Sequence, residues 1–355
     1  MGESKSWWSS LWDFLAGLFR STPPPPTDTG ELMPLQPRVL MIVYNPIVDP
    51  ATGAKLIAAM RWNDPDQLAA GYIADVRECS GGLVNYQIAQ KIEVDALPAK
   101  KDGFRYTPQE YVTVIQTHRG AHDPDAVDYD ALLAQFSVLP RVTAGEIDEV
   151  WLFGGPYFGF WEAAMGGAGA FFCNGGPLAN TAQCPRKFVV MGFNYERGIG
   201  EMLEDIGHRA EAILARVFKA EEFLQWTYTR GRSPATTTGA NLNLFERFLC
   251  FDQIAPSKSN IGTIHYAPNS QSDYEWGITT PVQSCADDWK QFPDLPAPPN
   301  YRVMDTRAWG GGDIRAHHKW WLAHLPKVAG ATNGIAHNWW KYVIQLNDPI
   351  FRDRL

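Results

Sequence analysis

A short apolar run that leads directly into a long amphipathic helix anchors the fold of this chain. Residues 188–193 (FVVMGF) are apolar enough for a strand buried on both faces, and residues 194–198 turn the chain into a helix that extends to Phe218. The apolar residues of this helix share one face: Met202, Leu203, Ile206, Ala210, Ile213, Leu214 and Val217. A strand that feeds such a helix is typical of α/β proteins with parallel sheets.

The same alternation of strands and helices occurs in the preceding half of the chain. The predicted strands are residues 39–44, 83–94, 147–153 and 188–193. The predicted helices are residues 65–79, a segment capped by Thr107, residues 128–139 and residues 199–218. We therefore expect an α/β fold with a mostly parallel sheet and flanking helices, plus an irregular, aromatic-rich C-terminal layer.

Composition divides the chain into three parts. Residues 1–21 form an aromatic amphipathic helix, and residues 22–37 form a proline-rich linker. Residues 38–355 form a single α/β body. Its C-terminal part, from about residue 230 to residue 355, is rich in glycine, proline, asparagine, serine and threonine, which indicates loops.

The N-terminal helix allows two interpretations. Its aromatic side chains between residues 7 and 19 suit the headgroup region of a membrane surface, and they equally suit docking on this protein or on a partner protein. The helix is too short and too polar to span a bilayer, and it has no clear cleavable signal peptide. Localisation therefore stays open, with peripheral membrane association as one option.

Net charge and cysteine usage disfavour two further classes of function. The formal net charge is −8, so the chain lacks the basic surface of a nucleic-acid-binding protein. The five cysteines show no C-x-x-C spacing, which disfavours a cysteine-rich zinc site. A Cys173–Cys184 disulfide is one option in an oxidising compartment, and the sequence does not decide the compartment.

Two loops follow predicted strands at the edge where parallel sheets usually place their sites. They are residues 154–177, which are rich in glycine, and residues 194–200, which lead into the long helix. No G-x-G-x-x-G follows a strand, and neither G-K-[ST] nor G-x-S-x-G is present. A dinucleotide fingerprint, a phosphate loop and a serine nucleophile elbow are therefore all disfavoured.

The polar face of the long helix carries four acids and one histidine: Glu201, Glu204, Asp205, His208 and Glu211. Glu204 and His208 are four residues apart, so both can bind one metal ion. H-E-x-x-H is absent, and we expect His265 or His317 to complete the ligand set. Glu201 or Glu211 would then act as general base. These residues predict a metal-dependent hydrolase with a divalent ion, zinc being the first choice, or no cofactor at all.

Other interpretations of the same residues stay open. The acidic face fits a solvated helix surface, and His317 fits packing among tryptophans. A second hypothesis is a non-enzymatic binding or assembly protein, attached through its N-terminal helix and holding a glycan on tryptophan platforms: Trp276, Trp309, Trp320 and Trp321. A third is a metal-free glycosidase that uses two facing carboxylates. Candidate acids of the loop-rich part are Asp273, Glu275, Asp287, Asp288 and Asp313, and the sequence does not decide whether one of them pairs with Glu201 or Glu204.

Three segments are distinctive as strings: residues 148–174, 188–211 and 317–326. They resemble segments of an uncharacterised bacterial protein family, and the similarity extends from about Arg38 to the C-terminus. The resemblance implies a single α/β body. It also implies secretion for many family members, but this chain departs from them by opening with an aromatic helix and a proline spacer. It brings no activity, cofactor or site residue.

Overall fold

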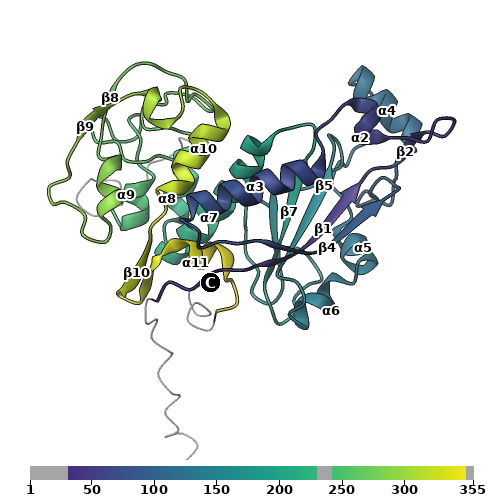
Figure 1. The fold of residues 1–355 in the computed structure, drawn as a ribbon, viewed down its shortest axis with the longest axis horizontal. Coiled ribbons are helices and arrows are strands. Elements are labelled where there is room, and N and C mark those ends of the chain that lie inside the picture. The colour runs from purple at the N-terminus through teal and green to yellow at the C-terminus, as the bar shows by residue number, and fades with distance from the viewer. Residues whose placement is uncertain (1–30, 230–241, 349–355) are drawn as a thin grey trace, which may run out of the picture.

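Figure 1 shows a computed structural model that describes residues 31–229 and 242–348. The expected α/β fold is confirmed. A five-stranded sheet has the order β4-β1-β5-β7-β6, in which the first four strands are parallel and β6 is antiparallel to β7. The strands of this sheet are β1 (Arg38–Tyr44), β4 (Gln87–Val94), β5 (Glu149–Gly154), β6 (Ala163–Gly166) and β7 (Phe188–Asn194).

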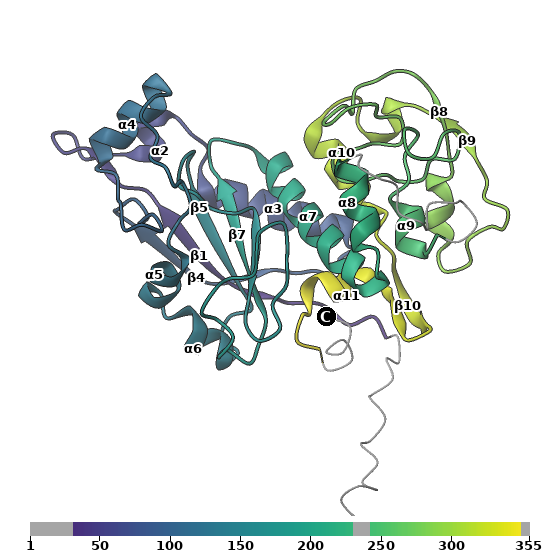
Figure 2. The same cartoon turned by 180° about the vertical axis from the view of Figure 1, so that it is seen from behind.

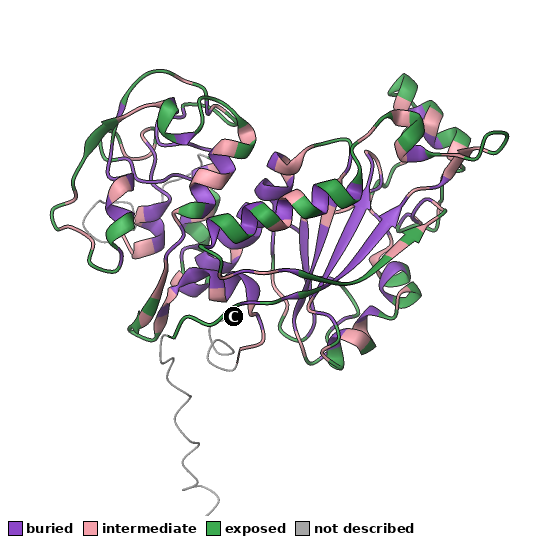
Figure 3. Cartoon of the chain, in the orientation of Figure 1, coloured by how far each residue is buried: buried purple, intermediate pink, exposed green. Residues whose placement is uncertain are grey.

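The central strands of the sheet are buried on both faces, as the continuous apolar runs predict. Every residue of β5 is buried, and Ile42 of β1 is in register with Ile92 on one side and Leu152 on the other. Figure 3 shows these strands as the most continuous buried region of the molecule. Edge strand β4 is mostly exposed, and it begins four residues later than the predicted strand 83–94.

The helices of the first part of the chain are α2 (Leu56–Met60), α3 (Pro65–Cys79), α4 (Pro108–Thr117), α5 (Tyr129–Gln135), α6 (Val138–Thr143) and α7 (Ile199–Phe218). The predicted starts of α3 and α4 are confirmed by their caps. Asp64 accepts hydrogen bonds from the first turn of α3, and Thr107 forms a capping box with Glu110. The single helix expected over residues 128–139 is two helices, because Ser137 adopts a left-handed backbone conformation (φ 50°).

Helix α7 lies between the sheet and the C-terminal layer. It contacts α3, and in the C-terminal layer it contacts α8 (Glu221–Thr229), α10 (Ile314–Ala323) and α11 (Trp339–Ile344). Gly207 allows one especially close approach, because a Cβ atom there would lie 2.5 Å from Ile264 Cγ1. The absence of that side chain brings the chain around Ile264 directly against α7.

The C-terminal layer is irregular, as expected, and Figure 2 shows it beside the sheet. Its remaining elements are α9 (Leu244–Phe248), β8 (Val282–Ser284), η1 (Ala286–Gln291), β9 (Arg302–Met304), η2 (Thr306–Trp309), β10 (Lys327–Thr332) and β11 (Ile335–Asn338). Residues 249–281 contain no helix or strand. Trp321 and Trp339 are fully buried in the same core as the sheet, so this layer shares its core with the α/β body.

The body begins before Arg38. Leu35 is buried, and its backbone N–H and C=O bond to Leu83 and Asn85. The predicted N-terminal helix (residues 1–21) and most of the predicted linker (residues 22–37) lie outside the described residues. A two-stranded ribbon of β2 (Ile47–Asp49) and β3 (Ala54–Lys55) follows β1.

Two expectations about chemistry and membranes can be compared with this fold. All five cysteines are free and buried, so Cys173 and Cys184 do not form a disulfide. Among residues 31–229 and 242–348, no helix combines the length and apolarity that a membrane span requires.

Candidate metal centre

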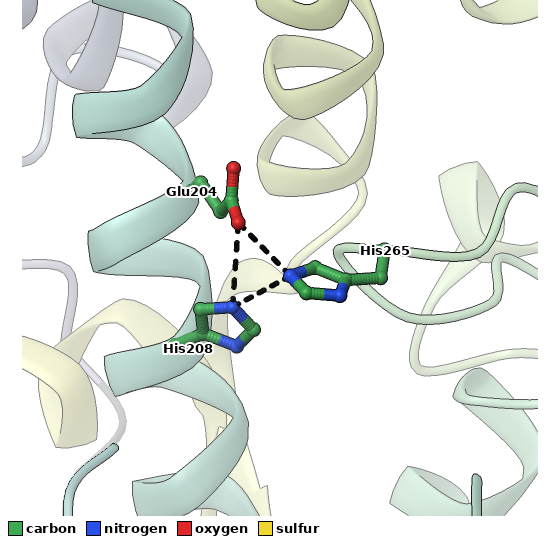
Figure 4. Close-up of side chains that lie close together, drawn as sticks. All are labelled: Glu204, His208 and His265. Carbon is green, nitrogen blue, oxygen red and sulfur yellow. Dashed lines mark hydrogen bonds and ion pairs between the residues drawn. The ribbon is translucent and has the colours of Figure 1, made fainter. Parts of the chain in front are cut away.

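Three side chains from two parts of the chain converge on one point (Figure 4). Glu204 and His208 come from successive turns of α7, and His265 comes from the irregular segment that Gly207 admits. His265 Nε2 lies 2.9 Å from both His208 Nε2 and Glu204 Oε1. His208 Nε2 lies 3.7 Å from the same Glu204 oxygen. The structure thus brings together the two ligands predicted on the helix and one of the two predicted elsewhere.

Carboxylates hold both imidazoles in place from behind. His208 Nδ1 faces Glu211 Oε2 at 3.1 Å, and His265 Nδ1 faces Asp273 Oδ1 at 2.9 Å. An ionised carboxylate can only accept hydrogen bonds, so we infer that each Nδ1 carries a hydrogen and donates it to the carboxylate. The free lone pair of each ring then lies on Nε2, the atom that faces Glu204. Histidines that bind metals are oriented by partners of this kind.

The donor set fits a divalent cation. Two imidazole lone pairs and a carboxylate oxygen, all acceptors, point at one another within 4.8 Å. These three electron-rich atoms repel one another unless a positive charge lies between them. Without a metal, a proton meets this need. Burial works to lower the pKa of His208, but its interactions with the carboxylates of Glu204 and Glu211 outweigh burial and raise that pKa to about 10. The site therefore stabilises positive charge.

Glu211 orients the residues of the centre, and its carboxylate does not point at the three converging ligand atoms. Its carboxylate is buried and accepts hydrogen bonds from three groups: His208 Nδ1, the Tyr228 hydroxyl at 2.7 Å and the Ile264 backbone N–H at 2.8 Å. The last bond ties the His265 segment to α7. Glu201, the other predicted general base, caps the helix by accepting the Gly198 N–H at 3.1 Å. Neither residue faces the point where the three ligand atoms meet.

Tyr274 covers the centre on the side of the C-terminal layer. Its hydroxyl donates to Glu204 Oε1 at 2.7 Å, and its ring packs against His265 at a tilt of 38°, with centroids 4.1 Å apart. Burial works to raise the pKa of Glu204, but its contacts with His208 and His265 and the hydrogen bond from Tyr274 hold that pKa well below its usual range. Glu204 is therefore ionised. Tyr274 has a left-handed backbone (φ 58°) and a half-exposed side chain.

Glu162 is a site residue that the sequence analysis missed. Its Oε2 lies 3.9 Å from His208 Nε2, and the Asn174 side-chain amide donates to the same carboxylate. A signal was available, because Glu162 is the only charged residue in the glycine-rich loop of residues 154–177. The position of that loop after a strand predicts a site there, and Glu162 is the acid that the loop brings to the centre.

The interpretation of the acidic face as a solvated surface is wrong. Glu204, Asp205 and Glu211 are all buried, because the C-terminal layer covers this face of α7. Asp205 has no role as a ligand in this group. Burial, reinforced by the neighbouring charges of Glu162 and Glu204, raises the pKa of Asp205 well above its ordinary value.

A cavity of about 700 Å³ opens beside the centre. His208, His265 and Glu162 lie at one end of it, and Tyr274 lines the same end. Its other lining residues are Phe171, Phe172, Asn174, Glu211, Ala212, Ala215, Arg216, Glu221, Leu224, Gln225 and Tyr228. Mainly apolar walls beside a few convergent polar groups are typical of a small-molecule site.

His317 is not part of the ligand cluster. It is fully buried and stacks on Trp276 with ring centroids 5.1 Å apart, which corrects its predicted role as a ligand. The expected glycan platform is also corrected. Trp309 and Trp321 are fully buried, Trp276 is nearly so, and the half-buried Trp320 packs against Trp309. These rings have too little exposed face to stack on a sugar.

Of the five loop acids considered for a glycosidase, only Asp273 reaches the centre, through His265. The other four support local structure instead. Glu275 accepts two backbone N–H groups of its own turn, and Asp313 caps α10. Asp287 pairs with basic side chains, and Asp288 accepts a backbone N–H. These contacts give no support to a carboxylate pair that faces across a cleft.

No protein-family model, curated protein sequence or solved structure matches this chain. Its function must therefore be argued from the site itself.

Proposed function

We propose that this protein is a metal-dependent hydrolase in which Glu204, His208 and His265 hold one divalent cation. The observation that carries the proposal is the convergence of three acceptor atoms, with a carboxylate behind each imidazole. Two imidazole Nε2 atoms that lie 2.9 Å apart need either a shared proton or a cation between them. A cation also gives a role to the carboxylate behind each imidazole.

Zinc is the ion that suits this ligand set best. Two imidazole nitrogens and one carboxylate oxygen, with a fourth position open to solvent, are the ligands of many catalytic zinc sites. A cation held by these residues would lie beside the cavity that Glu162 and His208 line. Bound there, a divalent cation would polarise a carbonyl group and make water more acidic.

Glu162 is the general base of this proposal. Its carboxylate lies on the cavity side of His208, 3.9 Å from Nε2, and its side chain is 45% exposed. It can therefore accept a proton from a water molecule held at the open position. Tyr274 holds Glu204 in place with its one hydroxyl hydrogen. Glu211 and Asp273 keep the two imidazoles oriented.

The metal content of the purified protein tests the ligand assignment. We expect close to one equivalent of zinc by elemental mass spectrometry, lost in His208→Ala and Glu204→Gln. His122→Ala is the matched control, because His122 also pairs with a carboxylate, Asp102 at 2.8 Å, but lies outside the cluster. A protein without metal after zinc is supplied, or a His208→Ala variant that keeps its metal, would contradict the assignment.

A second variant separates metal binding from hydrolysis. Glu162→Gln removes the base but leaves the three ligands, so it should keep the metal and lose turnover on chromogenic esters, amides or phosphoesters. The loss should be about 10²- to 10⁴-fold, the usual contribution of general acid–base catalysis. Full activity in Glu162→Gln would refute the role of this carboxylate while leaving the metal site intact.

A further inference from the structure

The cavity beside the candidate metal centre is a groove lined on one side by α7 and on another by α8. Five lining residues of α7 are spaced three and four residues apart and so share one face: His208, Glu211, Ala212, Ala215 and Arg216. The facing wall has the same spacing on α8: Glu221, Leu224, Gln225 and Tyr228. His208 and Arg216 are separated by eight residues, or about 12 Å along the helix axis.

The middle of this groove suits an apolar chain. Ala212 and Ala215 form a floor of small side chains, and Leu224, Phe171 and Phe172 add apolar surface. Phe172 is 63% exposed, which is unusual for so large an apolar side chain and typical of a binding surface. Because α7 and α8 use their backbone groups internally, the groove walls offer little to the backbone of a bound peptide, which usually pairs with a strand edge.

Arg216 gives the far end of the groove a positive charge. Its guanidinium lies over the Phe171 ring, 5.2 Å from the centroid, and its side chain is 47% exposed. The ion pair with Glu221 is long (3.7 Å) and exposed on both sides, so it holds the guanidinium weakly. A carboxylate that arrives along the groove can therefore replace Glu221 as its partner.

We propose that the substrate is an extended acyl compound that carries a carboxylate at the end remote from the bond that is cleaved. The inference rests on the proposed hydrolase function. The ester or amide carbonyl lies at the metal centre, the methylene chain lies on Ala212 and Ala215, and the terminal carboxylate pairs with Arg216. Water adds across the ester or amide bond, the C–O or C–N bond breaks, and the products are a dicarboxylic acid and an alcohol or amine.

Hydroxamic acids test this assignment without knowledge of the natural leaving group, because the hydroxamate binds the metal and the tail probes the groove. The probes are acetohydroxamate, octanohydroxamate and the monohydroxamate of suberic acid, titrated by calorimetry into the zinc-loaded protein. Octanohydroxamate should bind about tenfold or more tightly than acetohydroxamate, because its methylenes become buried. Suberic monohydroxamate should bind more tightly still at low salt, and that further gain should shrink as salt is added.

Two variants locate the chain and the carboxylate. Arg216→Met should remove the advantage of the suberic compound over octanohydroxamate, and Arg77→Met, a change at an exposed arginine on α3, should not. Ala212→Phe should weaken both long probes and leave acetohydroxamate unchanged. Ala70→Phe, at an exposed position of α3, controls for a general effect of the added ring.

The possible results distinguish a failure of the inference about the groove from a failure of the proposed metal site. Equal affinity for all three probes would overturn the acyl-chain inference and leave the proposed hydrolase standing. A length effect with no preference for the terminal carboxylate, or a preference that survives Arg216→Met, would overturn the anionic end. Failure of the protein to bind zinc would overturn the proposed function and this inference together.

Discussion

Replacing Asp273 by alanine tests whether the carboxylates behind the histidines shape the metal centre. Asp273 Oδ1 lies 2.9 Å from His265 Nδ1, where it fixes both the ring and the proton. Without it the ring can turn, and the proton can move to Nε2, the nitrogen that would bind the proposed metal ion. Loss of such a partner typically weakens metal affinity 10- to 100-fold.

The exposure of Asp273 sets the expected magnitude. Its side chain is 53% exposed, so water can replace part of the interaction and the effect should fall at the lower end of that range. We expect about tenfold weaker zinc binding, which corresponds to about 1.4 kcal/mol. Glu211 is buried and serves three donors, so Glu211→Gln should approach 100-fold, or about 2.7 kcal/mol.

Competition with a chromogenic chelator measures both affinities in one titration. Asp294→Ala is the control, because it removes an exposed acid from the same layer without touching a histidine of the centre. The melting temperature of Asp273→Ala should stay close to that of the unmodified protein when both are free of metal. If Asp273→Ala binds zinc as tightly as the unmodified protein, the argument from the paired carboxylates is refuted.

Three further predictions concern the rest of the molecule. Arg209→Met should lower the free energy of unfolding by about 3–5 kcal/mol in chemical denaturation, because Glu149, its partner at 2.7 Å, stays buried without a counter-charge. Stability should return when Glu149→Leu is added. A loss below about 1 kcal/mol would contradict this cause. Burial raises the pKa of Cys173 and of Cys250 to about 12, so native thiols should resist alkylation at pH 8, whereas all five should react after unfolding; rapid labelling of the native protein would oppose this. Deleting residues 1–30 should leave the melting temperature unchanged. If the N-terminal segment is a membrane anchor, the deletion should also abolish binding to lipid vesicles. Unchanged vesicle binding would exclude that role.

Local signals in the sequence were sufficient for most of the α/β body. Apolar runs predict the central strands because both faces of those strands are buried, and Asp64 and Thr107 mark helix starts because their side chains bond to the backbone close by. Ser137 divides a predicted helix through its backbone conformation, which side-chain periodicity does not report. The helix prediction fails there because of a local backbone conformation, not because of tertiary packing.

The metal centre could be predicted only in part, for a different reason. Helix spacing places Glu204 beside His208, but periodicity identifies the members of a face and not what covers it. The choice between His265 and His317 depended on a contact between Gly207 and Ile264, far apart in sequence. No pattern in a single sequence reports such a contact.

The origin of the three ligands also bears on how the protein holds together. His208 and His265 are 57 residues apart, and His265 belongs to a segment without helix or strand. A cation bound by both would close this loop as a cross-link, the role that a disulfide serves in other proteins. An ion present at a thousand times its Kd would add about 4.1 kcal/mol to the free energy of unfolding. Metal starvation should then loosen the C-terminal layer and expose it to proteases, so that the supply of the ion would govern the lifetime of the protein as well as its chemistry.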